Sequence, residues 1–241
     1  MKPPKILLLQ IREKAQVRAE EYASFCEFSG LKPAQLDILN VFDTPQFDNT
    51  VLQGYDGLFV GGASEASVLE PHNYPFLPSC VALLKHCIAI GFPTFASCFG
   101  FQLAVQALDG EIVRDDKDFE IGTLPISLTV EAQDDALMAT LPNPFFAVSV
   151  HRERATQFPE NTIALAYTDA CPHAFKVVNK PFWAFQFHPE VDKRILMERL
   201  SVYKTQYTDD EAHFDQIIAS AVETPESNHL VRLFIEAIDW S

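Results

Sequence analysis

Cys98 lies where one kind of sequence pattern gives way to another. Residues 93–97 are typical of a β-strand, whereas the apolar residues in 102–108 have helical spacing. A strand that turns sharply into a helix presents a nucleophile at its tip, and the turn needs small residues two positions away on each side. Ala96 and Gly100 occupy those positions. The helix dipole would favour a thiolate there, so we predict that Cys98 is a nucleophile rather than a buried structural thiol.

A cysteine nucleophile needs a base, and the base needs a third group that fixes its orientation. Residues 186–190, Gln-Phe-His-Pro-Glu, supply both at the end of an apolar run that starts at Phe182. His188 has the chemistry of a base, and Glu190 has that of its orienting partner. Pro189 between them limits the backbone.

Together, P-x-x-A-S-C-x-G-x-Q and Q-F-H-P-E resemble the class I (triad) glutamine amidotransferases. The similarity covers about residues 5–203, and the order and separation of the two motifs make it specific. It implies that Cys98 is the nucleophile, His188 the base and Glu190 its orienting partner.

The resemblance also implies an oxyanion hole. Gly61 and Gly62 follow a predicted strand at residues 55–60, at the sheet edge where open α/β folds bind ligands. In the family, this loop donates one N–H to the substrate oxyanion and the residue after the nucleophile, here Phe99, donates another. The family usually has proline after the two glycines, whereas this chain has Ala63. A loop that merely needs glycine for its backbone conformation is the structural alternative.

Two more residues are expected at the substrate site. Gln102 matches a family glutamine that contacts the bound glutamine, although a solvated helix residue is the alternative. His151, in the segment His151-Arg152-Glu153, resembles the H-x-D segment that lines the glutamine pocket of GMP synthase-type amidotransferases. A surface loop histidine is an equally weighted interpretation of His151. We expect no catalytic role for His173, which has no acidic neighbour in sequence.

The family's fold is α/β: a flavodoxin-like doubly wound parallel sheet with helices on both faces, a small antiparallel flap and, here, a helical C-terminal tail. We expect one domain over residues 1–241, with 191–241 as the helical extension. Strands are predicted at about 5–10, 35–42, 55–60, 93–97, 120–130, 145–150, 164–167, 174–178 and 182–187. Helices are predicted at about 13–28, 75–90, 98–108 and 193–203, from a capping box at Thr208 to 218, and from Thr224 onward. We interpret the tail as a cover over the sheet rather than as a docking surface.

Composition excludes several functions. A formal net charge of −15 over 241 residues argues against a nucleic-acid partner and against an anionic membrane surface. Five cysteines without paired spacing predict reduced thiols in a cytoplasm, and Cys26, Cys80 and Cys87 lie on apolar helical stripes as core thiols. No C-x-x-C or H-x-x-x-H spacing occurs, so we expect no dedicated metal site. Hydrolysis of an amide by a cysteine nucleophile needs no organic cofactor, and we expect none.

Three function classes stay open. The first is hydrolysis of the side-chain amide of L-glutamine, with ammonia passed to a separate synthase. The second is a stand-alone hydrolase or peptidase acting on γ-glutamyl compounds. The third, least favoured, is a non-catalytic regulatory module on the same fold. The chain has no G-x-x-x-x-G-K-[ST] phosphate loop, so we expect any amination step to belong to another polypeptide.

Overall fold

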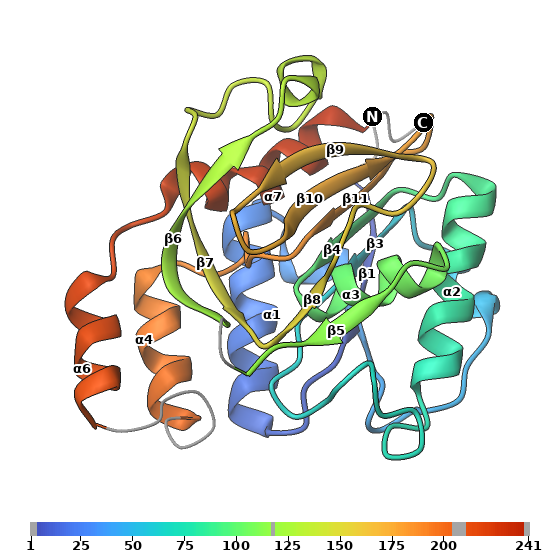
Figure 1. Ribbon diagram of the computed structural model, residues 1–241. Helices are drawn as coiled ribbons and strands as arrows, with labels where there is room; N and C mark the ends of the chain where they lie inside the picture. The colour runs from blue at the N-terminus through green and yellow to red at the C-terminus, as the bar shows by residue number, and fades with distance from the viewer. Residues whose placement is uncertain (1–3, 117–118, 204–210, 239–241) are drawn as a thin grey trace.

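The computed structural model describes residues 4–116, 119–203 and 211–238, which form a nine-stranded sheet flanked by helices (Figure 1). The strand order is β2-β1-β3-β4-β11-β10-β9-β6-β7. The first five strands in this order are all parallel, and the remaining four are antiparallel to their neighbours. These strands are β1 (Ile6–Gln10), β2 (Leu36–Asn40), β3 (Gly57–Val60), β4 (Thr94–Ser97), β6 (Glu120–Leu128), β7 (Phe145–His151), β9 (Thr162–Tyr167), β10 (Pro172–Val177) and β11 (Phe182–Phe185).

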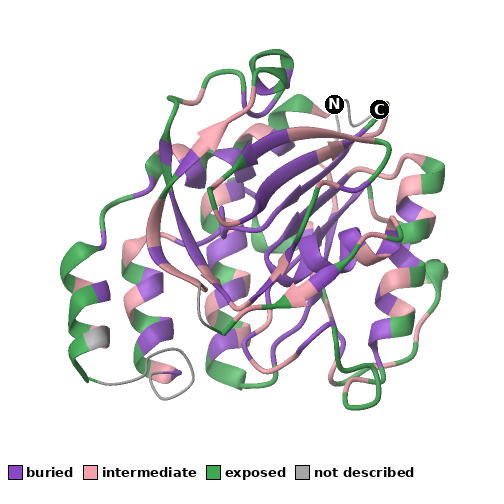
Figure 2. Ribbon diagram, in the orientation of Figure 1, coloured by how far each residue is buried: buried purple, intermediate pink, exposed green. Residues whose placement is uncertain are grey.

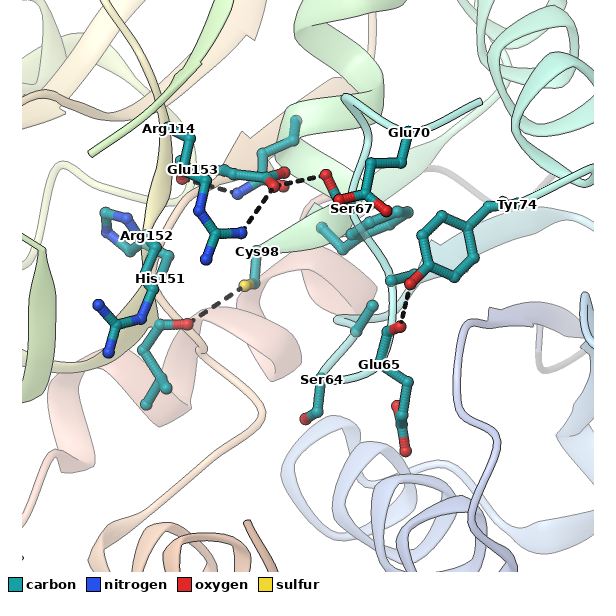
Figure 3. A pocket seen from close by; sticks show the side chains of 15 residues that line it. Ser64, Glu65, Ser67, Glu70, Tyr74, Cys98, Arg114, His151, Arg152 and Glu153 are labelled. Carbon is teal, nitrogen blue, oxygen red and sulfur yellow. Dashed lines mark hydrogen bonds and ion pairs between the residues drawn. The ribbon is translucent and has the colours of Figure 1, made fainter. Parts of the chain in front are cut away.

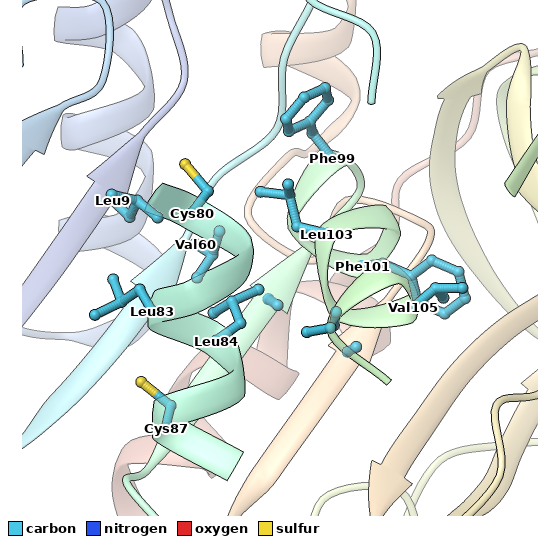
Figure 4. Close-up of a cluster of buried hydrophobic side chains, with 14 of the residues drawn as sticks. Leu9, Val60, Cys80, Leu83, Leu84, Cys87, Phe99, Phe101, Leu103 and Val105 are labelled. Carbon is cyan, nitrogen blue, oxygen red and sulfur yellow. The ribbon is translucent and has the colours of Figure 1, made fainter. Parts of the chain in front are cut away.

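The parallel strands are covered on both faces, and their alternating side chains divide between two cores. From β1, Leu7 and Leu9 pack with helices α2 (Leu77–Ile90) and α3 (Phe99–Ala107), the cluster drawn in Figure 4. Ile6 and Leu8 point the other way, toward α1 (Ala15–Ser29) and α7 (Pro225–Ala237). Burial on both faces explains why these strands are apolar at nearly every position. The flavodoxin-like, doubly wound sheet predicted from the sequence is confirmed.

The antiparallel part is larger than a small flap. Strand β6 meets β9 only through Ser127 and Leu128, whereas it pairs with β7 along seven residues. The β6–β7 ribbon therefore continues the sheet at one end and diverges from it at the other. A second ribbon, β5 (Ile112–Arg114) with β8 (Glu153–Ala155), lies apart from the main sheet and was not predicted.

The helices after Glu190 cover the sheet, as expected. Helix α7 lies beside α1 and buries Leu230, Val231 and Phe234 in the core on that face (Figures 1 and 2). Helices α4 (Lys193–Val202) and α6 (Glu211–Ser220) pack on the β6–β7 ribbon around Val148. The capping box predicted at Thr208 lies outside the described residues.

Most predicted boundaries agree with the structure to within two residues. The third strand begins at Gly57 rather than Tyr55, and α3 begins at Phe99, so Cys98 lies at the start of the helix as predicted. None of the helices in the described segments combines the length and apolarity needed to span a bilayer.

Candidate active site

Cys98 sits in a strained turn between β4 and α3. Its backbone has φ 50° and ψ −100°, and it caps the helix N-terminus. A non-glycine residue with positive φ costs about 1–3 kcal/mol and persists only where the surroundings enforce it. Here its N–H donates to the Phe185 carbonyl at 2.7 Å. Gly100 permits the close approach to β3, because a Cβ atom there would lie 2.8 Å from the Val60 carbonyl oxygen.

His188 and Glu190 follow β11, the strand hydrogen-bonded alongside β4. The imidazole Nδ1 of His188 lies 2.7 Å from Glu190 Oε1, and both residues are buried. The His188 N–H donates to the Val148 carbonyl at 2.8 Å, which holds the loop against β7. These contacts fix the ring, with Nδ1 turned to the carboxylate.

The electrostatics of this pair are strongly coupled. Burial alone would lower the pKa of His188, but the charges of Cys98 and Glu190, and hydrogen bonds to both, raise it to about 9. Burial opposes ionisation of Glu190 as well, yet His188 and then Arg199 bring the pKa of that carboxyl down to about 2. At neutral pH, the arrangement favours an imidazolium between a carboxylate and the cysteine sulfur.

In the loop predicted to form the oxyanion hole, one of the two glycine N–H groups is already hydrogen-bonded. The Gly61 N–H donates to the Leu9 carbonyl at 3.1 Å, so in this structure it continues the sheet and cannot also bind an oxyanion. The prediction of Gly61 as a donor is therefore corrected, and Gly62 is the loop glycine at the site. A Cβ atom at Gly62 would lie 2.8 Å from Cε1 of His188, which explains glycine at this position. The Phe99 N–H is in the first turn of α3, where no intrahelical acceptor exists.

A pocket of about 200 Å³ opens beside Cys98 (Figure 3). Cys98 is one of the residues that line it, with Sγ 4.0 Å from the Val150 carbonyl oxygen. Gln102 lines the pocket and is buried, which excludes the solvated alternative, and its Nε2 donates to the Glu153 carbonyl at 2.8 Å. His151 also lines the pocket, but it is buried and its Nε2 lies 3.1 Å from Glu120 Oε2. The interpretation of His151 as a surface loop residue is therefore wrong.

Charged side chains of both signs occupy the rest of the pocket wall. Arg114, at the end of β5, and Arg152, between β7 and β8, line the pocket on one side. Glu65 and Glu70, in the loop after β3, line it on the other (Figure 3). Glu153 lies between them, with Oε1 accepting from Ser67 Oγ at 2.5 Å and lying 3.9 Å from Arg114 Nη1.

A buried ion pair that was not predicted from the sequence lies beneath the Gly61–Gly62 loop. Arg12 and Glu21 are almost fully buried, with Nε of the arginine 2.9 Å from Oε1 of the glutamate. Arg12 Nη1 also donates to Ser64 Oγ at 2.9 Å, which ties the loop after Gly62 to β1 and α1. The available signal was the position of Arg12, a charged residue just beyond a buried strand at the ligand-binding edge.

A side chain of the C-terminal extension binds the backbone of the segment that carries His188 and Glu190. Asn228 of α7 is buried, and its Nδ2 donates to the carbonyls of Pro189 and Val191, each at 2.9 Å. Ser24 of α1 donates to the Glu190 carbonyl. The segment that carries His188 and Glu190 is therefore held from two helices as well as from the sheet.

The family model for class-I glutamine amidotransferases matches residues 34–200, which is more than half of the chain. The chain belongs to this family. Among curated relatives of this amidotransferase, a glutamine-hydrolysing GMP synthase of Salmonella newport is 30% identical over 141 residues. Another, from Shewanella sp. strain ANA-3, is 27% identical over 142 residues. The match covers 56% of this chain but only 25% and 26% of those two relatives, respectively.

Solved structures resemble the amidotransferase over nearly its whole length. A glutamine amidotransferase of Thermotoga maritima aligns over 98% of both chains, with a TM-score of 0.74 and 18% identity. One from Methylobacillus flagellatus aligns over 98% of this chain and 96% of its own, with a TM-score of 0.72 and 16% identity. At this level of identity the similarity shows a shared fold, including the C-terminal extension.

Proposed function

We propose that this amidotransferase hydrolyses the side-chain amide of glutamine and delivers the ammonia to a separate synthase. The observation that carries the proposal is that Cys98 lines the pocket and interacts with His188, which is hydrogen-bonded to Glu190. Family membership and the named activity of the GMP synthase relatives support the choice of glutamine.

In the first half-reaction, the Cys98 thiolate attacks the amide carbon and forms a tetrahedral adduct. The N–H groups of Phe99 and Gly62 stabilise its oxyanion. The His188 imidazolium donates a proton to the departing nitrogen, the C–N bond breaks, and ammonia leaves a γ-glutamyl thioester on Cys98. Glu190 keeps the ring oriented and its charge stabilised.

In the second half-reaction, neutral His188 takes a proton from water, whose oxygen attacks the thioester carbonyl. The carbon–sulfur bond breaks, glutamate is released, and the Cys98 thiolate is restored beside the imidazolium. One glutamine and one water give one glutamate and one ammonia, and no redox change occurs.

The pocket suits a zwitterionic amino acid. A γ-glutamyl group carries an α-carboxylate and an α-ammonium at the end remote from the reacting amide. Arg114 and Arg152 offer guanidinium groups for the carboxylate, and Glu70 offers a carboxylate for the ammonium. Gln102 and His151 complete the walls near the reacting carbon.

Ammonia and glutamate release from glutamine, measured on the purified chain alongside γ-glutamyl peptides and asparagine, tests this function. We expect turnover of glutamine and none of asparagine, whose shorter side chain cannot place its amide at Cys98 while its α-groups reach the charged wall. Absence of turnover on every γ-glutamyl compound, both alone and with a synthase, would contradict the proposal.

One observation favours a second candidate, a self-sufficient γ-glutamyl hydrolase. The loop after Gly62 is held by the Arg12–Ser64 hydrogen bond, and Arg12 is itself fixed by Glu21. A loop braced from within the chain needs no partner to set its conformation. The peptide arm of the same assay separates the two candidates.

A further inference from the structure

A second cluster of titratable side chains reaches the pocket wall through His151, and no step of the proposed reaction uses it. Glu120 on β6, His151 on β7, and Cys171 and His173 at the start of β10 bring four potential ligand atoms within 4.8 Å of one another. The two histidines and the cysteine are buried, and Glu120 is partly buried.

The two imidazoles and the thiol converge on one carboxylate oxygen of Glu120. Oε2 of Glu120 lies 2.8 Å from His173 Nε2, 3.1 Å from His151 Nε2 and 3.5 Å from Cys171 Sγ. Donors around a tetrahedral zinc ion are separated by about 3.3–3.7 Å, as zinc–nitrogen and zinc–sulfur bond lengths dictate. The three separations from Glu120 Oε2 lie within this range or somewhat below it, as expected where protons rather than a metal lie between the atoms, and no pair of ligand atoms is more than 4.8 Å apart.

We propose that Glu120, His151, Cys171 and His173 form a tetrahedral Zn²⁺ site. Two imidazoles, a thiolate and a carboxylate are all ligands that zinc accepts, whereas magnesium and calcium require oxygen ligands. The alternative is a cluster without a metal, in which the four groups are held together by hydrogen bonds. The protons of those hydrogen bonds are the ones that zinc would displace. Zinc binding exchanges the thiol proton, and any proton shared between Glu120 and the imidazoles, for the metal.

The site would join parts of the fold that the backbone connects weakly. At its Glu120 end, the β6–β7 ribbon is far from the two residues that pair β6 with β9, whereas His173 belongs to the main sheet. The His173 carbonyl accepts from the Gln186 N–H at 2.8 Å, and its ring stacks near Phe187. A metal here would fix the pocket wall at His151 relative to the segment that carries His188.

Sequence spacing gives no indication of this site. Glu120 and His151 are far from each other and from the Cys171-Pro172-His173 segment along the chain, and only strand pairing brings them together. The expectation of no metal site rested on the absence of short ligand spacings, which this arrangement does not need.

The test uses the full chain with Cys98→Ala, so that the Cys98–His188 pair cannot supply ligands. After removal of metal with a chelator, the protein is titrated with Zn²⁺ against a chromophoric competitor, and separately with Co²⁺ as a spectroscopic probe. We expect one Zn²⁺ per chain, release of at least one proton, and a thiolate-to-cobalt charge-transfer band with the intense visible absorption of tetrahedral cobalt.

Adding Cys171→Ala should weaken Zn²⁺ binding by more than about 100-fold and remove the charge-transfer band. Cys80→Ala, which truncates a buried thiol on α2, is the matched control and should leave both unchanged. No zinc binding by the Cys98→Ala protein, or a cobalt spectrum without a thiolate band, would overturn the proposal. The cobalt spectrum needs no further variant, so it decides even if Cys171→Ala does not fold.

Discussion

At the scale of single residues, environment separates Cys98 from the other cysteines. Burial raises the pKa of both Cys80 and Cys87 to about 12, which keeps these thiols protonated. Burial also raises the pKa of Cys171, and Glu120 adds to the effect. Cys98 alone combines a helix N-terminus, a pocket and an imidazole neighbour. The proposal that Cys98 is the nucleophile rests on these surroundings, which the other thiols lack.

Cys98→Ala should abolish turnover of every γ-glutamyl substrate and leave the fold intact. A glutamine-mimicking electrophile, with mass spectrometry of the digested protein, should locate the label on Cys98. Cys26, Cys80, Cys87 and Cys171 provide four internal controls in the same sample. Earlier labelling of any of them, or turnover retained by Cys98→Ala, would contradict the assignment.

His188 and Glu190 should differ in how much activity their loss removes. His188→Ala removes the proton donor and acceptor, and we expect a loss comparable to that of Cys98→Ala, beyond about 10²–10⁴-fold. Glu190→Gln keeps a hydrogen-bond acceptor near Nδ1 and should leave more residual turnover. Steady-state rates of the two variants check this ranking, and the reverse order would count against the proposed roles.

The pH profile gives an independent measure of the same pair. The pKa of His188 is raised above its ordinary value of 6.5, so the imidazolium persists at neutral pH and is lost as pH rises through about 9. We expect kcat/KM for glutamine to fall above that pH, since the departing ammonia then lacks its proton donor. The Glu190 carboxylate contributes to the raised pKa, so in Glu190→Gln the fall should move to lower pH. If kcat/KM of Glu190→Gln falls at the same pH as that of the wild type, a group other than the coupled His188–Glu190 pair sets the fall.

At the scale of elements, the positions of the site residues are determined more by contacts with elements distant in sequence than by their sequence neighbours. The turn at Cys98 was predictable, because its small flanking residues have a local steric reason. The brace by Asn228 was not, since the hydrogen bonds join α7 to a loop 37–39 residues earlier. The Gly61 donor was predicted wrongly for a related reason: the motif indicates where the loop lies, but not which N–H the adjacent strand uses.

Asn228→Ala tests the contribution of α7 to the site. Two buried carbonyls would lose their donor, which costs about 1–3 kcal/mol of stability for an unsatisfied buried group. The loop carrying His188 should also lose its fixed position, so kcat should fall more than KM rises. His229→Ala, an exposed neighbour on the same helix, should change neither quantity. Urea unfolding and steady-state kinetics on both variants measure the two effects, and a stability loss with unchanged kcat would make the brace purely structural.

At the scale of the whole molecule, the parallel sheet and its helices could be predicted, because the spacing of apolar residues within each segment distinguishes a strand from a helix. The β5–β8 ribbon could not, because three-residue strands have too few residues to show one. In the site, Cys98, His188 and Glu190 occur in compact motifs. Arg12, Glu21 and the cluster at Glu120 are distributed along the chain and converge only after folding.

Dependence on a partner is the property of the whole molecule that separates the two candidate functions. With the Gly61 N–H bonded to the Leu9 carbonyl, the oxyanion hole that we propose has only the N–H groups of Gly62 and Phe99. Ala63 follows Gly62 where proline would stiffen the loop, whereas the Arg12–Ser64 bond restrains it. Because a free glutaminase would waste nitrogen, we expect the isolated chain to turn over slowly. Adding a GMP synthase-type synthase with ATP and its nucleotide substrate should then raise turnover by at least about tenfold.

Ser64→Ala identifies what holds the loop. If a partner sets the loop, the variant and the wild type should reach the same rate once the synthase is present, because docking replaces the lost restraint. If the Arg12–Ser64 hydrogen bond alone sets the loop conformation, the wild type should cleave glutamine without a synthase at about 10 s⁻¹, a typical enzymatic rate. Ser64→Ala should then be slower both with and without the synthase. The second result would replace the ammonia donor with a self-sufficient hydrolase, and its substrate would then be sought among the γ-glutamyl peptides that fit the charged wall at Arg114 and Glu70.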